Sequence, residues 1–206
     1  LNNAGAVFTE YQQTTEGLEM TFAVNHINYF LLTNLLLDTI KKTAQEKGEA
    51  RIINVASDAH QSARNGLNFE HLNDQSGYSA FGTYGNTKLA NILFTYELAR
   101  RLEDTNVTVN AVHPGFVATG FGQNTGGAMK FLIGIATRFF AKSPDQGAET
   151  LIYLASSPDV ATITGKYWAN KKPKKSTDIS HDRDQQHRLW EMSEQLTGTA
   201  QSTAGV

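Results

Sequence analysis

Thr83-Tyr84-Gly85-Asn86-Thr87-Lys88-Leu89-Ala90 carries a phenol and an ammonium four residues apart. On a helix this spacing places the two side chains next to each other. A tyrosine in a model peptide has a pKa of about 10, and two unit charges about 4 Å apart at an effective dielectric of about 20 interact by about 4 kcal/mol. Lys88 is therefore expected to lower the pKa of Tyr84 by up to about three units, toward neutral. The spacing alone also occurs on solvated helices, so the surrounding motifs decide between the two interpretations.

Four further segments surround this pair in a fixed order. They are Asn2-Asn3-Ala4-Gly5, Val24-Asn25-His26, Ile52-Ile53-Asn54-Val55-Ala56-Ser57, and His113-Pro114-Gly115-Phe116-Val117-Ala118-Thr119. Together with Tyr-x-x-x-Lys, the set resembles the short-chain dehydrogenase/reductase family, from residue 1 to about Gly198. The local sequence around Ser57, Lys88 and His113 is most similar to that of the retinol-dehydrogenase and protochlorophyllide-reductase-like branch.

The resemblance implies an α/β fold, a Rossmann-like doubly wound parallel sheet present as its carboxyl-terminal portion, strands four to seven. The family's Thr-Gly-x-x-x-Gly-x-Gly phosphate cradle does not occur in the sequence, and the chain begins at Leu1. We therefore expect residues 1–206 to be a single, amino-terminally truncated domain. Hydride transfer is expected of the parent protein, and the isolated chain is expected to be inactive.

Sequence patterns place the elements along the chain. Apolar periodicity predicts helices over 18–47, 83–102 and 145–156 and around Leu189, Trp190, Met192 and Leu196, whereas β-branched runs predict strands over 51–55, 107–112 and 163–169. Gly48 ends the first helix, and Ser143-Pro144 starts the third. Strands separated by helices predict a parallel sheet.

Composition narrows the function classes. The chain has 40% hydrophobic and 18% charged residues, which is typical of an α/β domain, and we expect it to be cytoplasmic. Its net charge of -2 predicts that it does not bind nucleic acid. Cysteine is absent and no His-x-x-x-His pair occurs, so no metal site is predicted. No uninterrupted apolar stretch reaches the roughly 18 residues of a membrane span.

The resemblance assigns four catalytic residues. Tyr84 exchanges the hydroxyl proton, Lys88 lowers its pKa and contacts the cofactor ribose, Ser57 orients the substrate oxygen, and Asn25 holds a water of the proton relay. Ser57 also follows a strand, at the sheet edge where ligands bind in parallel α/β folds. Each of two assignments has a non-catalytic alternative. Ser57 can be an ordinary turn serine, and Asn25 can be a polar side chain that only packs in the interior.

The resemblance also assigns the residues that bind NADP or NAD, with NADP favoured by the branch. They are Asn3, Ala4, Gly5, Tyr84, Lys88, Pro114, Gly115, Val117 and Thr119. Asn2 or Asn3 can instead connect neighbouring strands, and Pro114-Gly115 can be a simple loop. The apolar run 129–140 lies where the family has its substrate lid, and it also suits peripheral membrane contact or subunit packing.

The sequence therefore predicts an oxidoreductase that transfers a hydride between a nicotinamide cofactor and a small apolar alcohol/carbonyl substrate. The alternative from another class is a non-catalytic binding or scaffold protein. An epimerase or dehydratase would need a longer carboxyl-terminal region, and a light-dependent protochlorophyllide reductase would carry cysteines. The family implies a homodimer or homotetramer through the helices that begin near Leu18 and Thr83. The run 171–175 is expected to be a solvated loop.

Overall fold

The computed structural model describes residues 1–75, 78–115 and 143–199. Its sheet has the strand order β1-β2-β3-β4. The strands are β1 (Ala50–Val55), β2 (Val107–His113), β3 (Lys166–Ala169) and β4 (Lys172–Pro173). The first three pair in parallel, as predicted, with Val55 opposite Val112 and Val112 opposite Trp168. Asn2 extends the sheet beyond β1 through a single parallel bridge to Asn54.

Two details of the sheet differ from the prediction. β3 begins at Lys166 rather than at Ile163, because Gly165 adopts a left-handed conformation with φ 66° and turns the chain just before the strand. β4 is a short antiparallel strand within the basic run that was predicted to be a loop. Both of its residues are exposed, so the run is solvated as expected.

The first predicted helix is divided by a π turn. α1 (Met20–Phe22) leads into the π turn η1 (Ala23–Ile27), and α2 (Asn28–Lys47) follows. The helix begins after Glu19, whose carboxylate accepts hydrogen bonds from the backbone N–H groups of Thr21 and Phe22. It ends at Gly48, in a left-handed conformation with φ 91°.

The other helices lie close to their predicted positions. They are α3 (Ala80–Arg101), α5 (Pro144–Ser156) and α6 (Arg183–Thr197), with 3-10 turns η2 (Asp58–Ala63), η3 (Pro158–Val160) and η4 (Asp178–His181). α3 begins three residues before Thr83, so Tyr84 lies in its second turn. Ser143 and Gln146 form a capping box at the start of α5.

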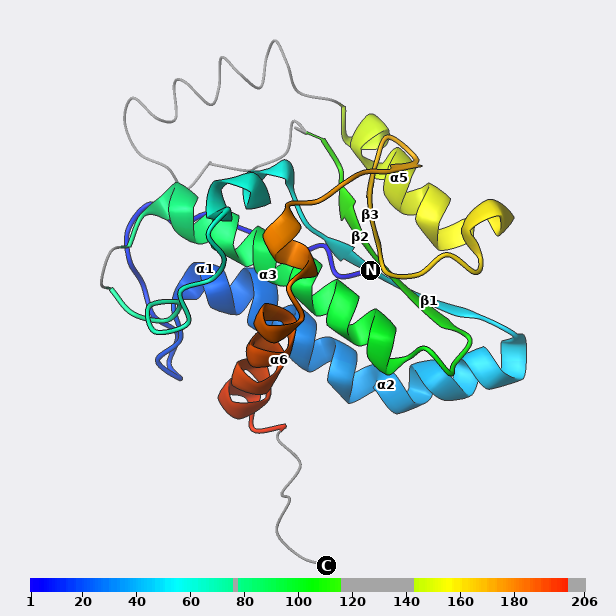
Figure 1. Ribbon diagram of the computed structural model, residues 1–206, viewed down its shortest axis with the longest axis horizontal. Helices are drawn as coiled ribbons and strands as arrows, with labels where there is room; N and C mark the ends of the chain where they lie inside the picture. Colours follow the sequence, from blue (N-terminus) through cyan, green and yellow to red (C-terminus); the bar gives the residue numbers. More distant parts are fainter. Residues whose placement is uncertain (76–77, 116–142, 200–206) are drawn as a thin grey trace, which may run out of the picture.

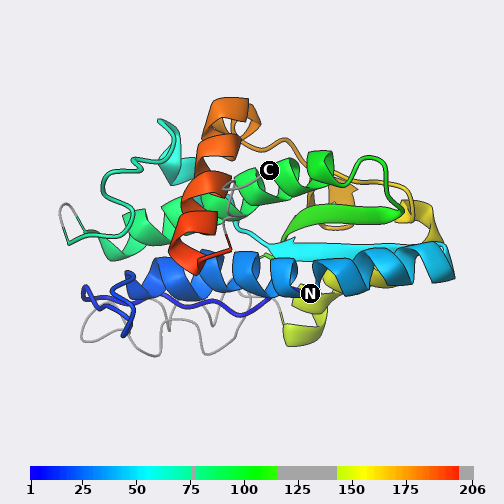
Figure 2. The ribbon, with the colours of Figure 1, turned by 90° about the horizontal axis from the view of Figure 1, so that it is seen from below.

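Helices cover both faces of the sheet (Figures 1 and 2). On one face, Ile52 and Val109 pack with Phe30 of α2 and Phe94 of α3. On the other, Val55 and Val112 pack with residues of α5, because successive side chains of a strand point to opposite faces. This arrangement confirms the doubly wound α/β architecture.

α6 crosses α3 on the outside of the α2–α3 layer (Figure 1). Trp190 of α6 lies 4.9 Å from the ring of Phe30 and stacks on Phe94 at 5.9 Å. Leu189 joins a second core cluster with Phe22 and Leu93. Within the described ranges, no helix combines the length and the apolar character needed to cross a membrane.

Candidate active site

Tyr84 and Lys88 lie together on α3, at the end where β1 and β2 finish. The Lys88 Nζ is 5.3 Å from the centroid of the Tyr84 ring, as the four-residue spacing predicts. Lys88 is buried, with 3% of its surface exposed, and Tyr84 is half-buried. Nζ donates a hydrogen bond to the Val55 carbonyl at 3.2 Å, which anchors the ammonium to the end of β1.

The structure reverses the predicted direction of the Tyr84 pKa shift. Burial raises the pKa of Tyr84 to about 12, although a hydrogen bond with Ser57 acts in the opposite direction. Burial also lowers the pKa of Lys88 to about 8. Desolvation disfavours both the phenolate and the ammonium, and it is the largest cause of both shifts. The prediction that Lys88 brings Tyr84 close to neutral is therefore wrong for this structure, in which Tyr84 is a protonated phenol at neutral pH.

Ser57 reaches Tyr84 from the carboxyl end of β1. Its side chain hydrogen-bonds Tyr84, and its Oγ accepts from the Ala59 N–H at 3.2 Å as the cap of η2. His60 holds the Ser57 carbonyl through Nδ1 at 2.7 Å, and its Nε2 accepts from the Thr177 N–H at 3.2 Å. Ser57 is thus held both by its own cap and by the segment after β4.

Asn25 is fully buried in the π turn and faces inward, as predicted. Its Oδ1 accepts from the Ala6 N–H at 2.8 Å, and its Nδ2 donates to the Ala6 carbonyl at 2.9 Å and to the Thr87 Oγ1 at 3.1 Å. These bonds satisfy the amide and tie the amino-terminal turn to α3, one residue before Lys88. The role of Asn25 in a proton relay stays a prediction.

In the Asn2-Asn3-Ala4-Gly5 turn, the first residue holds neighbouring elements together and the other three are exposed. Asn2 connects elements, because its Nδ2 donates to the Thr33 Oγ1 at 2.9 Å and to the Asn54 Oδ1 at 2.7 Å. Asn3, Ala4 and Gly5 are exposed. A Cβ on Gly5 would lie 3.4 Å from the Asn25 Oδ1 and 3.5 Å from the Lys88 Nζ, so the turn runs directly past the ammonium.

Pro114 and Gly115 follow β2 directly, on the same edge of the sheet as Ser57. Gly115 has a φ of 93°, which favours glycine, so the segment turns sharply here. The predicted cofactor contacts Val117 and Thr119 and the run 129–140 lie outside the described residues.

Asp58 was missed by the sequence interpretation although it directly follows Ser57. Its carboxylate accepts from the Tyr167 hydroxyl at 2.9 Å and from the Lys174 Nζ at 2.7 Å, and it lies 3.4 Å from the His113 Nε2. Burial raises its pKa, but the hydrogen bond from Lys174 and the charge of His113 outweigh burial and hold the pKa below its ordinary value. Asp58 thereby joins the loop after β1 to the end of β2 and to β3 and β4.

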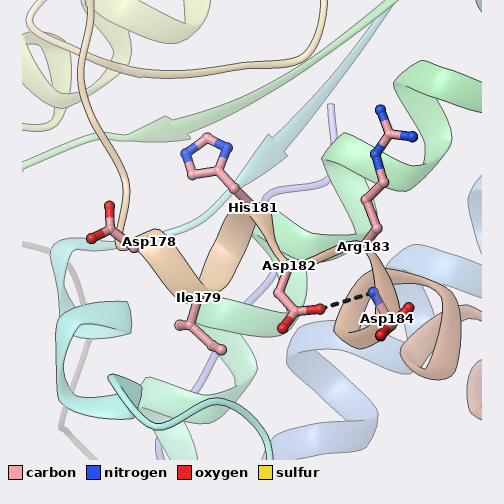
Figure 3. Close-up of a pocket in the computed structure, with 6 residues that line it drawn as sticks. All are labelled: Asp178, Ile179, His181, Asp182, Arg183 and Asp184. Carbon is pink, nitrogen blue, oxygen red and sulfur yellow. Dashed lines mark hydrogen bonds between the residues drawn. The ribbon is translucent and has the colours of Figure 1, made fainter.

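A surface pocket lies apart from these residues. It has a volume of about 510 Å³ and lies where η4 meets α6, lined by Asp178, Ile179, His181, Asp182, Arg183 and Asp184 (Figure 3). The Asp182 carboxylate there accepts from the Asp184 N–H at 2.9 Å as the cap of α6. None of the predicted site residues within the described ranges lines this pocket.

Gly85, next to Tyr84, lets α3 pack closely against η2. A Cβ at this position would lie 2.9 Å from the Ala59 carbonyl oxygen and would also overlap the Ser62 Oγ. We expect Gly85→Ala to lower the free energy of unfolding by up to about 2 kcal/mol, because overpacking costs about 1–3 kcal/mol and the helix propensity of alanine returns about 1 kcal/mol. Urea denaturation measures the change.

Gly82 on the same helix is the matched control. Among the described residues a Cβ there would meet Ser79 alone, at 3.4 Å, so Gly82→Ala is expected to keep or raise stability. Equal effects of the two substitutions would show that the contact with η2 does not constrain position 85.

Comparison with known proteins gives consistent matches. The family model described as short chain dehydrogenase matches residues 1–129. Retinol dehydrogenase 14 of Mus musculus is 42% identical over 200 residues, which cover 96% of this chain and 58% of that protein. The chain thus spans less than two thirds of this relative's length.

Solved structures agree with the sequence matches. The crystal structure of an uncharacterized protein from Mycobacterium Paratuberculosis superposes with a TM-score of 0.71 at 30% identity, covering 96% of this chain and 65% of that one. The 3-ketoacyl-(acyl-carrier-protein) reductase from Brucella melitensis, complexed with NADH, gives a TM-score of 0.55 at 26% identity, covering 81% and 62%. With the family model matched over more than half of its residues, this chain belongs to the short-chain dehydrogenase family.

Proposed function

We propose that the chain carries the proton-transfer residues of a nicotinamide-dependent oxidoreductase that acts on an apolar alcohol or the corresponding carbonyl. The observation that carries the proposal is the convergence of Tyr84, Lys88 and Ser57 at one edge of the sheet, with the Gly5 turn running past the ammonium. These groups come from three separate segments of the chain.

Tyr84 is the acid of this mechanism. Its raised pKa keeps the hydroxyl protonated at neutral pH, so in carbonyl reduction it gives its proton to the substrate oxygen. In alcohol oxidation Tyr84 first loses its own proton to solvent, and the phenolate then takes the hydroxyl proton of the alcohol. Ser57, which bonds Tyr84 in this structure, would turn its one O–H to the same substrate oxygen and fix its position. A bound nicotinamide supplies or accepts the hydride.

Lys88 is suited to hold the ribose beside the nicotinamide. Among the described residues its Nζ makes one hydrogen bond, to the Val55 carbonyl, and an ammonium has three N–H donors. The absence of a side chain on Gly5 leaves the ammonium approachable from the exposed turn. The rest of the cofactor site would be lined by Asn3, Ala4, Gly5, Pro114 and Gly115, together with the predicted Val117 and Thr119.

The apolar substrate is supported by the relative named retinol dehydrogenase 14, since retinol is an apolar alcohol. A cytoplasmic location stays part of the proposal. So does a homodimer or homotetramer, for which Leu32, Leu35 and Leu36 on α2 offer an exposed apolar surface. A single truncated domain over residues 1–206 is likewise proposed.

The proposal is tested by adding NADH or NADPH at millimolar concentration to the 206-residue chain and recording amide NMR spectra. Chemical-shift changes are expected at Gly5, Ser57, Lys88 and Gly115, and not in the pocket at η4 and α6. Gly5→Val places a branched side chain against Asn25 and Lys88 and should reduce the changes. No change with either nucleotide at the highest concentration would show that the 206-residue chain does not bind the cofactor by itself, and the titration is then repeated with the parent protein. No change in the parent protein would favour a non-catalytic binding or scaffold protein.

A further inference from the structure

Asn91 is the centre of a buried hydrogen-bond chain that leads from the surface helix α6 to Lys88. It lies on α3, three residues after Lys88, and is fully buried. Its Nδ2 donates to the Asn25 carbonyl at 3.0 Å and to the Val55 carbonyl at 3.1 Å. Its Oδ1 lies 3.2 Å from the His26 Nδ1. The side chain therefore bonds the π turn at two places and the end of β1.

The orientation of this amide follows from its partners. Backbone carbonyls can only accept, so the NH₂ group must face Asn25 and Val55 and the oxygen must face His26. His26 then donates from Nδ1. In its neutral form it accepts at Nε2, where the Ser193 Oγ of α6 lies 3.0 Å away. Ser193 and His26 thereby hold Asn91 in one orientation.

The Val55 carbonyl connects this chain to Lys88. It accepts from the Asn91 Nδ2 at 3.1 Å and from the Lys88 Nζ at 3.2 Å. A carbonyl oxygen has two lone pairs, so the two donors use its full capacity. The positive end of the amide and the ammonium are also like-signed neighbours at one oxygen, which weakens the hold of Val55 on Lys88.

We propose that Asn91 is a positioning residue for Lys88, fixing the Val55 carbonyl and limiting how strongly that carbonyl binds the ammonium. The inference rests on the proposed function, in which the remaining Lys88 donors bind the cofactor ribose. Asn91 acts through Val55 and the π turn and does not touch the substrate. The same bonds hold Asn25, so one side chain sets the relative placement of two predicted catalytic residues.

The test follows the titration of the Lys88 side chain by ¹³C NMR in the 206-residue chain, with the Lys88 signal assigned by its loss in Lys88→Met. Wild type should titrate near pH 8, since burial lowers the pKa of Lys88 to about 8. The titratable group beside it is Tyr84, which stays protonated in this range. Asn91→Leu removes the competing donor, so the midpoint should rise by about 0.7 pH unit, equivalent to one hydrogen bond of about 1 kcal/mol.

Thr95→Val is the matched control. Thr95 is fully buried on the same helix, donates to the Asn91 backbone carbonyl at 2.7 Å and accepts from the Asn54 Nδ2 at 3.0 Å, without touching Val55. It should lower stability without moving the Lys88 midpoint. If Asn91→Leu does not fold, Asn91→Ser removes the same two bonds without added bulk and is titrated in its place.

An unchanged or lowered midpoint in the Asn91 variant would overturn the proposal, and so would an equal rise in Thr95→Val. The titration needs neither cofactor nor turnover, so its result is separate from that of the proposed function. A raised midpoint in the 206-residue chain, together with a parent protein that shows no nucleotide contacts, would establish the positioning of Lys88 and refute the oxidoreductase. An unchanged midpoint in a protein that binds nucleotide would refute the positioning of Lys88 by Asn91 and leave the proposed oxidoreductase standing.

Discussion

In the full-length parent protein, Tyr84→Phe is expected to lower turnover by about 10²-fold or more, which is the usual contribution of a positioned acid or base. The substitution removes the one hydroxyl that gives or takes the substrate proton and leaves the ring that packs beside Lys88. Nucleotide binding should change little, because the proposed ribose contacts belong to Lys88. Steady-state kinetics of carbonyl reduction with NADH or NADPH, together with nucleotide titration of the variant, measures both effects.

Tyr96→Phe is the matched control for this experiment. Tyr96 lies on the same helix and is also half-buried, but its hydroxyl bonds the Ser176 Oγ at 2.8 Å rather than Ser57. Its loss should leave turnover close to that of wild type. Near-normal turnover in Tyr84→Phe would remove Tyr84 from the mechanism. Equal losses in both variants would point to a general effect of disturbing α3.

The sequence was sufficient for the parallel sheet and for the meeting of Tyr84 with Lys88, because both depend on short-range patterns. The β-branched strands and their intervening helices are local signals. The four-residue spacing fixes the two side chains on one helix face whatever surrounds the helix. Ser57 was predictable in the same way, since strand ends in a parallel sheet meet at one edge.

The pKa of Tyr84 was not predictable because it depends on burial, which is a tertiary property. The spacing gave the attraction of Lys88 but not the desolvation of both groups, and desolvation sets the direction of the shift. The polar chain through Asn91 was missed for a similar reason. Its partners His26 and Ser193 are distant in sequence from Asn91, and no local pattern connects them.

The stability of the chain is expected to fall as the pH is lowered from about 6.5 to about 4, because His26 is buried in its neutral form. Burial lowers the pKa of His26 to about 4, from about 6.5 in an unfolded chain. Above pH 6.5 both states are neutral at this residue and its contribution is complete. Between the two values the unfolded state gains a proton that the folded state does not, which costs up to about 3 kcal/mol. Urea denaturation across this range measures the slope.

The comparison of His26→Gln with His71→Gln isolates this effect. His26→Gln should flatten the slope relative to wild type, whereas carboxylates and His60, whose pKa burial also lowers, contribute equally to both proteins and cancel. His71 is exposed and its pKa is raised by Asp74, so its removal should leave the fall in place. The difference in slope between His26→Gln and wild type therefore reports on the buried ring.

An unchanged slope in His26→Gln would mean that His26 is charged in the folded protein. Both ring nitrogens would then donate, to the Asn91 Oδ1 and to the Ser193 Oγ, and the Ser193 hydroxyl would give its proton only to the Leu189 carbonyl, to which it donates at 2.7 Å. The ring lies between Phe22 and Phe94, at 5.3 and 6.0 Å, so such a charge would be buried against aromatic rings with only neutral hydrogen-bond partners. Because an unpaired buried charge is costly, we expect the neutral ring and the pH-dependent loss of stability that follows from it.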